Sequence, residues 1–531
     1  MGLFFLGVLC PELAGAERWK SLGWKIILQE AVRQVRADGF HFEQSTYYHV
    51  YALDFFLHSA VLAGLNGIPT PKSFEDTLEK MLTALCVLGR GGTPARFGDD
   101  DGGRLFDGRR NRSQHLMDPL ATGAILFHRG DFKTAAGGLR EETLWLLGAE
   151  GVREWDGLRE AEVSRESTAL PDSGLYLLAA GKSQIAVDAG PLGAQSGGHG
   201  HADALSVCLA SNGHSLLIDP GTYEYIGPGN DRNLFRGTAM HNTVGIDGKD
   251  QAEPASPFSW HRFPQAKVER WVRGKGFDLL VASHDGYQRL EAPVTHRRWV
   301  VSLKGGLYLI RDVAEGQGRH RFDLGWHLGQ DLQLVEKGLY RVKGASQCLV
   351  ILPAEGHGWA EEVRKDSCSP AYGQKSPMTV LNFGTEAALP AEFAVLLVTL
   401  EESYRAAPLF ARMDRSGGRS ETPAYRYASE GSEYLFVFGK RGEPWRSARL
   451  SSDAEFVGWQ QKPGGADQHL LLCGGTFARV DGGVELRWDR SVDWAELDLK
   501  GNSRTVFCSD KAAVDRASAE IKPPSASVPE F

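Results

Sequence analysis

The chain has 531 residues, of which 42% are hydrophobic and 24% are charged, and its formal net charge at pH 7 is −8. This composition is typical of an ordinary globular protein, and the length predicts two or three domains. Because no basic excess is available to neutralise phosphates, we expect no general nucleic-acid binding; a local basic cleft for an acidic sugar is compatible with this charge. No apolar run approaches the roughly 18 residues that a membrane span needs. The seven cysteines are widely spaced and contain no CxxC pair, which argues against a disulfide framework.

The first part of the chain, residues 1–150, is predicted to be helical. Apolar residues recur at helical intervals in Trp24–Val35, Tyr47–Leu65 and Phe74–Leu88. Glycines and prolines separate these segments, and paired helices with glycine-rich turns favour an α/α array. The short apolar run at the start of the chain lacks the basic segment of a signal peptide.

An acidic, glycine-rich stretch, Arg96–Arg104, follows these helices. Its spacing does not fit an EF-hand calcium loop. From the residues alone we interpret it either as a solvated turn or as a cation site.

From about Ser173 the pattern changes to short apolar runs that are separated by Gly, Pro, Asp or Asn. Examples are Leu175–Leu178, Gln184–Val187, Leu279–Ala282 and Trp299–Leu303. Many short runs with turn residues between them predict antiparallel sandwich sheets. We divide the chain into a partial helical domain (1–150), a linker (151–172), a sheet domain (173–400), a C-terminal β-sheet region (401–509) and a disordered tail (510–531).

A dense group of histidines and carboxylates lies near the start of the sheet region. His199 and His201 occur within Gly197–Asp203, and on an extended strand they would share one face. Asp219 ends one apolar run and His241 begins another, so each is expected at the edge of a buried strand. Two histidine nitrogens and one carboxylate oxygen suit zinc, and a further histidine remains for proton chemistry.

These blocks resemble the heparinase II/III family of polysaccharide lyases, which includes alginate and oligoalginate lyases. The matching segments are His199–Asp203, Leu217–Tyr223 and Arg236–Val244, with a further block upstream at Asp38–His49. The resemblance implies a multidomain α+β fold, in which an incomplete N-terminal (α/α) toroid precedes antiparallel β-sandwich sheets. It also implies β-elimination on a uronate-containing acidic polysaccharide, with a 4,5-unsaturated uronate as the product. The substrate stays open between alginate, a heparin-like glycosaminoglycan and a bacterial exopolysaccharide.

The resemblance also implies roles for single residues. Tyr48 and His199 match the catalytic residues, although Tyr48 could also be a core aromatic residue on a helix; His201, Asp219 and His241 match the ligands of a structural zinc ion. Arg236 is expected either to bind a substrate carboxylate through its planar fork of donors or to form an ordinary ion pair. Tyr223 and Tyr225 are expected to line the cleft, with His49 and Glu43 as further substrate-binding candidates. The acidic stretch is implied to have a structural or substrate-facing role.

The family carries an Asn and a His upstream of the catalytic Tyr, and counting back from Tyr48 places this pair before Met1. The resemblance therefore implies an N-terminally truncated chain in which residues 1–10 are a toroid helix. Members of the family that the chain resembles work largely in the periplasm or outside the cell. Two other functions stay open: a non-catalytic glycan-binding remnant, and a zinc hydrolase in which the three metal ligands hold an activated water.

Overall fold

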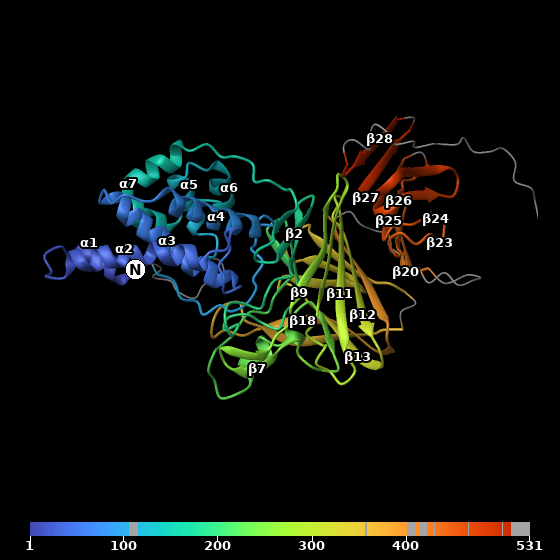
Figure 1. Cartoon of the computed structure of the whole chain (residues 1–531), viewed down its shortest axis with the longest axis horizontal. Helices are drawn as coiled ribbons and strands as arrows, with labels where there is room; N and C mark the ends of the chain where they lie inside the picture. The colour runs from blue at the N-terminus through green and yellow to red at the C-terminus, as the bar shows by residue number, and fades with distance from the viewer. Residues whose placement is uncertain are drawn as a thin grey trace, which may run out of the picture.

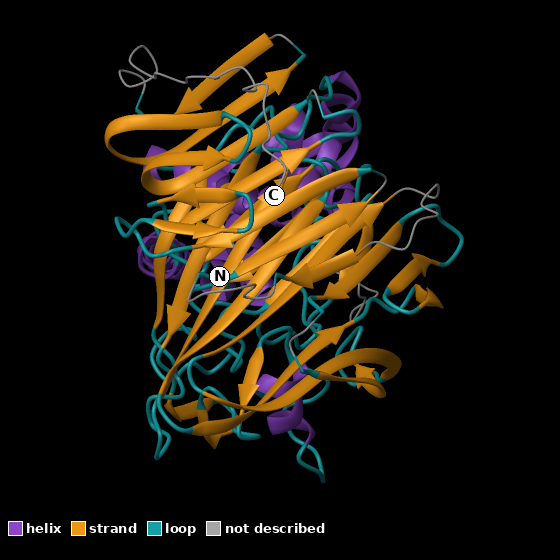
Figure 2. Ribbon diagram, turned by 90° about the vertical axis from the view of Figure 1, so that its right-hand side faces the viewer, coloured by secondary structure: helices purple, strands orange, loops and turns teal. Residues whose placement is uncertain are grey.

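The computed structural model describes residues 1–105, 115–355, 358–400, 409–413, 422–429, 431–465, 467–501 and 503–510. Within these residues seven α-helices precede the first strand, which is the predicted order, and a short helix at residues 231–235 lies among the antiparallel strands that follow. Figure 1 shows the helices gathered on one side of the molecule and the sheets on the other. Figure 2 looks at the sheets, with helices behind them. The predicted disordered tail lies outside the described residues, apart from its first residue.

The helical region packs around a core of its own. Its helices are α1 (Gly2–Leu9), α2 (Ala16–Gln34), α3 (Thr46–Leu65), α4 (Lys72–Leu88), α5 (Pro119–Leu126), α6 (Gly130–Ala136) and α7 (Glu141–Gly157). Their apolar faces meet in a cluster that includes Leu53, Leu57 and Leu82, which are all fully buried. The helices predicted from apolar periodicity are therefore confirmed as α2, α3 and α4. Closure of the helices into a toroid and the sandwich topology of the sheets stay predictions.

The helical region extends beyond the boundary that we predicted at residue 150, because α7 continues to Gly157. Gly148 lies inside α7 with φ 58° and ψ −152°, a conformation that glycine adopts far more readily than other residues. This glycine kinks the helix without ending it, whereas glycine in a sequence ordinarily indicates a helix end. The connection to the first strand is residues 158–167, which is shorter than the predicted linker.

Within the described ranges the strands form four larger antiparallel sheets and one two-stranded hairpin, and the strands of each larger sheet are named in their order of pairing. The first sheet is β1 (Thr168–Leu170), β2 (Leu175–Ala180), β3 (Ser183–Asp188), β4 (Val207–Ser211) and β5 (His214–Leu217). The central sheet is β14 (Leu332–Glu336), β15 (Leu339–Val342), β16 (Cys348–Pro353), β19 (Ala391–Leu400), β12 (Leu307–Gly316), β11 (Val294–Leu303), β10 (Phe277–His284) and β9 (Ala266–Arg273). The lateral sheet is β17 (Ala360–Cys368), β18 (Ser376–Ala388), β13 (Arg319–His327) and β6 (Val244–Ile246).

The C-terminal sheet is β20 (Leu409–Arg412), β21 (Ala424–Ser429), β22 (Ser432–Phe438), β25 (Phe456–Gln461), β26 (Gln468–Val480), β24 (Leu450–Ser452) and β23 (Trp445–Ser447), with β27 (Val484–Lys500) and β28 (Ser503–Cys508) paired beside β26. A separate hairpin joins β7 (Glu253–Ser256) to β8 (Ser259–Arg262). The strand segments that we named from the sequence are confirmed as parts of β2, β3, β10 and β11.

The central sheet is covered on both faces, because its side chains alternate between two cores. In β10, Leu280 and Ala282 join a core shared with the first and lateral sheets, whereas Leu279 and Val281 join a core shared with the C-terminal sheet. Successive side chains of a strand point to opposite faces, so this alternation stacks the sheets in layers. The first sheet packs its other face on the helical region, through a cluster that includes Leu175.

None of the helices in the described residues combines the length and the apolar character needed to cross a bilayer. The seven cysteines are unpaired, and all except Cys10 are buried.

Candidate functional site

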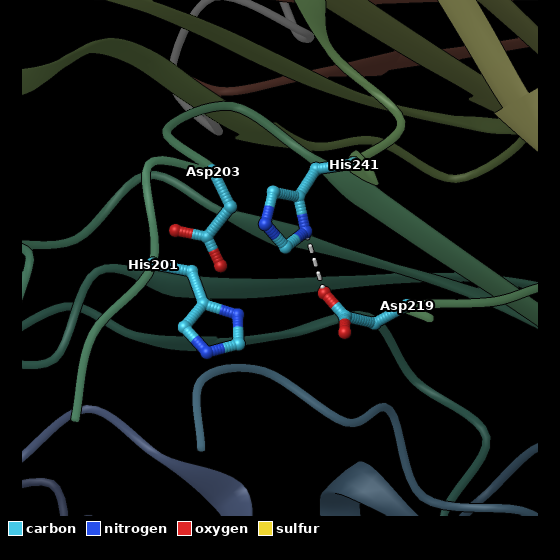
Figure 3. A group of neighbouring side chains, drawn as sticks. All are labelled: His201, Asp203, Asp219 and His241. Atoms are coloured by element: carbon cyan, nitrogen blue, oxygen red, sulfur yellow. Dashed lines mark hydrogen bonds and ion pairs between the residues drawn. The ribbon is translucent and has the colours of Figure 1, made fainter. Parts of the chain in front are cut away.

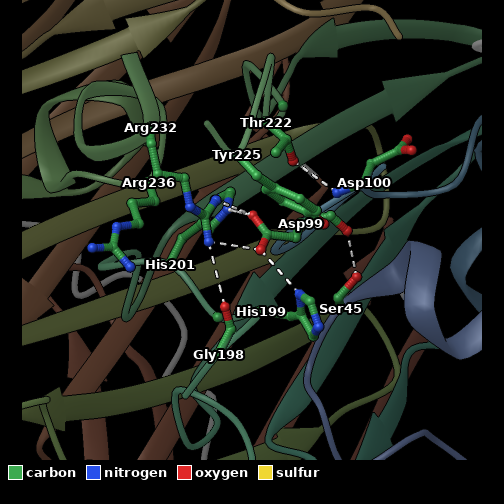
Figure 4. Close-up of polar contacts among 12 residues, drawn as sticks. Ser45, Asp99, Asp100, Gly198, His199, His201, Thr222, Tyr225, Arg232 and Arg236 are labelled. Atoms are coloured by element: carbon green, nitrogen blue, oxygen red, sulfur yellow. Dashed lines mark hydrogen bonds and ion pairs between the residues drawn. The ribbon is translucent and has the colours of Figure 1, made fainter. Parts of the chain in front are cut away.

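Several of the predicted site residues, among them His199, His201 and Tyr225, lie close together near the contact between the helical region and the first sheet (Figure 4). Two loops define this place: the acidic loop, residues 96–104, and the histidine loop, residues 197–206. The backbone N–H of Asp99 donates to the carbonyl of His199 over 2.9 Å, which joins the two loops. Ser45, the N-cap of α3, donates from its hydroxyl to the Asp99 carbonyl over 2.6 Å. These bonds hold distant parts of the sequence in one unit.

Tyr48 and His199, the two predicted catalytic residues, are in direct contact. Their rings stack with centroids 3.8 Å apart and an interplanar angle of 21°. The Tyr48 hydroxyl donates to Asp101 Oδ2 over 3.1 Å and lies 2.9 Å from the hydroxyl of Tyr225. Burial raises the pKa of Tyr48, so its phenol keeps its proton near neutral pH.

The histidine loop is not an extended strand, so the shared strand face considered for His199 and His201 does not occur. It is an irregular segment that leads into β4, and close packing requires a glycine at position 200. At Gly200 a Cβ atom would lie 1.5 Å from the carbonyl oxygen of Leu192. The expectation for the other two residues is confirmed, because Asp219 follows β5 and His241 precedes β6.

Asp99 connects both histidines to a buried arginine. His199 Nδ1 lies 3.1 Å from Asp99 Oδ2, and His201 Nε2 lies 2.9 Å from Asp99 Oδ1. Arg232, on the short helix α8 (Asp231–Phe235), donates to both oxygens of Asp99, with Nη2 2.7 Å from Oδ2. Burial acts to raise the pKa of Asp99, but the hydrogen bonds of the two histidines and the charge of Arg232 hold it well below its usual range. Asp99 is therefore an ionised carboxylate near neutral pH.

Three of the predicted substrate-binding residues lie in partly exposed positions. Tyr225 contacts the Tyr48 hydroxyl, as described above, and Glu43 Oε2 is 4.0 Å from His199 Nε2. Burial raises the pKa of Glu43. Tyr223 does not contact this group of side chains: its ring packs against Phe235 at 5.7 Å between centroids, with the ammonium of Lys375 4.2 Å from its centroid.

His49 and Arg236 are fully buried, which argues against the substrate contact expected of His49 and against the first of the two roles expected of Arg236. Both side chains are 0% exposed. His49 Nε2 lies 3.1 Å from the carbonyl of Met81, and its ring stacks on Phe40. The guanidinium group of Arg236 donates to Asn233 Oδ1 and to the backbone carbonyls of Ser256 and Pro257. Arg232, four residues earlier on α8, donates to Asp99 in the site instead.

A second group of side chains can hold a metal ion (Figure 3). His201, Asp203, Asp219 and His241 each offer a ligand atom, and these atoms all lie within 4.8 Å of one another. The group contains the three metal ligands that we predicted and adds Asp203. The sequence carried a signal for Asp203, since it lies two residues after His201 in the quoted motif.

The atoms of this group fit a bound cation. His201 Nδ1 and His241 Nε2 are buried and have no hydrogen-bond partner among the described residues, so both nitrogens are free to bind a metal. Asp219 Oδ2 lies 2.8 Å from His241 Nδ1. Burial and the charge of Asp188 raise the pKa of Asp203 well above its usual range, and a cation would offset both effects. Two imidazoles and two carboxylates are a donor set that zinc accepts.

The helical region contains another cluster of this kind, but an arginine already occupies its centre. Asp54, His58 and Glu142 are buried with their ligand atoms close together. Arg104 donates to Asp54 Oδ2 over 2.7 Å and also to Glu142. We therefore interpret this cluster as an ion-pair network that ties the end of the acidic loop to α3 and α7.

Comparison with known proteins points to one family. The family model for the heparinase II/III-like C-terminal domain matches residues 162–397, and the model for the heparinase II/III N-terminus matches residues 1–100. A heparin-sulfate lyase of Pedobacter heparinus is 26% identical over 338 residues, which are 62% of this chain and 45% of that protein. A heparin-sulfate lyase of Bacteroides stercoris is 25% identical over 337 residues, 61% of this chain and 44% of that protein. The chain thus spans about half the length of the curated relatives that it matches.

Solved structures show the same fold. A heparan sulfate lyase mutant from Pedobacter heparinus matches with a TM-score of 0.63 and 21% identity over 81% of this chain and 64% of that chain. A structure of heparinase III matches with a TM-score of 0.63 and 16% identity over 82% of this chain and 65% of that chain.

Proposed function

The chain belongs to the heparinase II/III-like family, and from this premise we propose that it is a polysaccharide lyase that cleaves a uronate-containing acidic polysaccharide by β-elimination. We propose a glycosaminoglycan of the heparan sulfate type as its substrate, because the curated relatives are heparin-sulfate lyases. The observation that supports the reaction most is the stacking of Tyr48 on His199, since both side chains can transfer protons.

In the proposed reaction, His199 removes the proton at C5 of the uronate through Nε2. Asp99 lies at Nδ1 of the same ring and leaves Nε2 as the accepting atom. The electron pair of the C5–H bond forms the C4–C5 double bond, and the bond from C4 to the leaving oxygen breaks. Tyr48, which keeps its proton near neutral pH, donates its phenolic proton to that oxygen. Solvent then protonates Tyr48 and accepts the proton from His199.

We further propose that His201, Asp203, Asp219 and His241 hold a structural zinc ion. Zinc at this position would cross-link the histidine loop, the segment after β5 and the segment before β6, directly beneath His199. The support is a closed set of four donors, none of which is more than 7% exposed. Because a catalytic zinc keeps an open position for water, this burial argues against the alternative of a zinc hydrolase. Since its substrate is an extracellular polymer, we propose that the protein works in the periplasm or outside the cell.

The lyase proposal predicts a rise in ultraviolet absorbance when the protein is incubated with heparan sulfate, because the product carries a conjugated double bond. The test compares heparan sulfate, alginate, hyaluronan and chondroitin. We expect His199→Ala to lose the signal by about 100-fold or more, and His214→Ala, which changes a histidine on β5, to keep it. Shorter chains without ultraviolet absorbance would instead indicate a hydrolase. An intact polymer that still binds the protein would indicate a glycan-binding remnant.

The zinc proposal predicts that the purified protein contains zinc in an equimolar amount, as measured by atomic emission. His241→Ala removes one of the four donors, so this variant is expected to lose the metal and to unfold at a lower temperature. The matched control is again His214→Ala, which should retain the metal. Equal zinc contents in the wild-type protein and in His241→Ala would refute this site.

A further inference from the structure

The carboxylate of Asp99 is the point at which two histidines with different proposed roles meet (Figure 4). His199 approaches one oxygen through Nδ1 and His201 approaches the other through Nε2, at 3.1 and 2.9 Å. Arg232 donates to the same two oxygens with the two arms of its fork. Asp99 is fully buried, so these three side chains form the polar surroundings of its carboxylate.

The hydrogen-bonding capacity of this carboxylate determines where the protons lie. An ionised carboxylate accepts at about four lone-pair sites and cannot donate. Each oxygen of Asp99 faces one N–H of Arg232 and one ring nitrogen. Both ring nitrogens must therefore donate, so a neutral His199 carries its proton on Nδ1 and a neutral His201 carries it on Nε2.

This assignment leaves a lone pair on the opposite nitrogen of each ring. In His199 that atom is Nε2, on a side chain that is 22% exposed at the site. In His201 it is Nδ1, which is buried, has no hydrogen-bond partner among the described residues, and belongs to the proposed metal group. By accepting a hydrogen bond from each ring, Asp99 thus leaves the lone pair of His199 on Nε2, toward the substrate, and the lone pair of His201 on Nδ1, toward the metal group.

We infer that Asp99 is a positioning residue that holds His199 and His201 in the tautomers required for proton removal and for metal binding, with Arg232 as its buried counter-charge. The inference rests on the proposed lyase function for His199 and on the proposed zinc site for His201. Asp99 itself does not contact the substrate.

The surroundings of Arg232 support its role as a counter-charge. Its side chain is only 8% exposed. Its Nε donates to the carbonyl of Pro257 over 2.8 Å, and Nη2 also lies 3.4 Å from the carbonyl of Gly198. The guanidinium carbon is 5.0 Å from the ring centroid of Tyr225, whose face adds a further favourable contact. Since its donors are directed inward, Arg232 serves Asp99 rather than a substrate carboxylate.

The variant Asp99→Asn tests the inference, because an amide of nearly the same shape offers one accepting oxygen and one donating nitrogen. One of the two rings would then face an N–H group and would have to reverse its tautomer. We expect the affinity for zinc, measured by competition with a chromophoric chelator, to fall about 10- to 100-fold. We expect kcat, measured with saturating zinc, to fall by a similar factor while KM changes little. NMR of labelled histidine ring nitrogens should show which of the two rings, His199 or His201, reverses its tautomer.

Asp100→Asn is the matched control. Asp100 lies in the same acidic loop, is 7% exposed, and binds Arg96 and the backbone N–H of Gly102 rather than either histidine. This variant should keep its zinc affinity, its kcat and the tautomer of His199.

A second variant covers the case in which Asp99→Asn fails to fold, since it leaves Arg232 buried and unpaired. The double variant Asp99→Asn with Arg232→Gln removes both charges together, and circular dichroism reports whether it is folded. We expect the same loss of zinc affinity and the same tautomer change in this variant.

Unchanged zinc affinity and an unchanged tautomer of His199 in the folded double variant would overturn the inference. A wild-type protein that binds no zinc would also overturn it, since His201 would then have no metal to bind. A wild-type protein that binds zinc but shows no lyase activity would refute the proposed function alone. The zinc and NMR results would still decide the role of Asp99 in that case.

Discussion

Tyr48→Phe is expected to lower kcat about 10²- to 10⁴-fold while leaving the affinity for the polysaccharide nearly unchanged. The variant removes only the hydroxyl that protonates the leaving oxygen in the proposed reaction, which is the size of effect that general acid catalysis commonly has. The ring would still stack on His199, so the shape of the site is kept. The measurements are initial rates of ultraviolet absorbance with heparan sulfate and a calorimetric titration with the same polymer.

Tyr51→Phe is the control for this variant, because Tyr51 lies one turn further along α3 with its ring centroid 6.3 Å from that of Tyr48. It should keep most of the wild-type rate, because the hydroxyl of Tyr51 takes no part in the proposed proton transfers. If Tyr48→Phe retained the wild-type kcat, Tyr48 could not be the acid. The hydroxyl of Tyr225, 2.9 Å away, would then be the next candidate.

Arg298→Met is expected to lower the free energy of unfolding by about 3–5 kcal/mol, because it removes one partner of a buried ion pair and leaves the charge of Asp312 without that partner. Arg298, on β11, binds both oxygens of its cross-strand neighbour Asp312 at 2.7 and 3.0 Å. Its Nη1 also donates to the carbonyls of Leu205 and Asn242, at 2.7 and 2.6 Å. These carbonyls belong to the segments that carry the proposed zinc ligands, so Arg298 ties the site to the central sheet.

Arg297→Met provides the comparison on the same strand. Arg297 pairs with Glu269 and Glu315 at a position where its side chain is 25% exposed, and such pairs contribute about 1 kcal/mol or less. Urea unfolding followed by tryptophan fluorescence should separate the two variants clearly. Adding Asp312→Asn to Arg298→Met should recover part of the loss, since the buried charge is then removed. Equal midpoints for Arg297→Met and Arg298→Met would contradict the proposed role of Arg298.

Much of the fold could be predicted because local patterns of apolar and turn residues determine where its helices and strands lie. The apolar spacing of the segment from Tyr47 to Leu65 matches α3, and the run from Gln184 to Val187 matches β3. Both elements are largely buried, β3 along its whole length, so the runs of apolar residues and the turn residues that bound them indicate these elements. The last helix, α7, continues through a kink at Gly148 to Gly157, so glycine alone does not mark the end of the helical region.

For the predicted site, too, some features followed from local sequence patterns and others did not. Tyr48 and His199 were named from motif blocks, and the structure brings their rings together. His49, one residue after Tyr48 in the same block, is buried on another side of α3, because successive helical residues do not share a face. Motif membership identified the block but not the direction of each side chain.

By itself, the sequence determined the family, the order of helices and strands, and the set of histidines and carboxylates from which the site is built. These properties depend on local periodicity and on short motifs. Only the tertiary structure decided that Asp99 joins His199 to His201, because about 100 residues separate Asp99 from each of them. It also decided that Arg232 rather than Arg236 faces this carboxylate. Hydrogen bonds between groups so distant in the chain follow from the packing of the helical region on the first sheet, and no local pattern encodes which donors will meet at a buried charge.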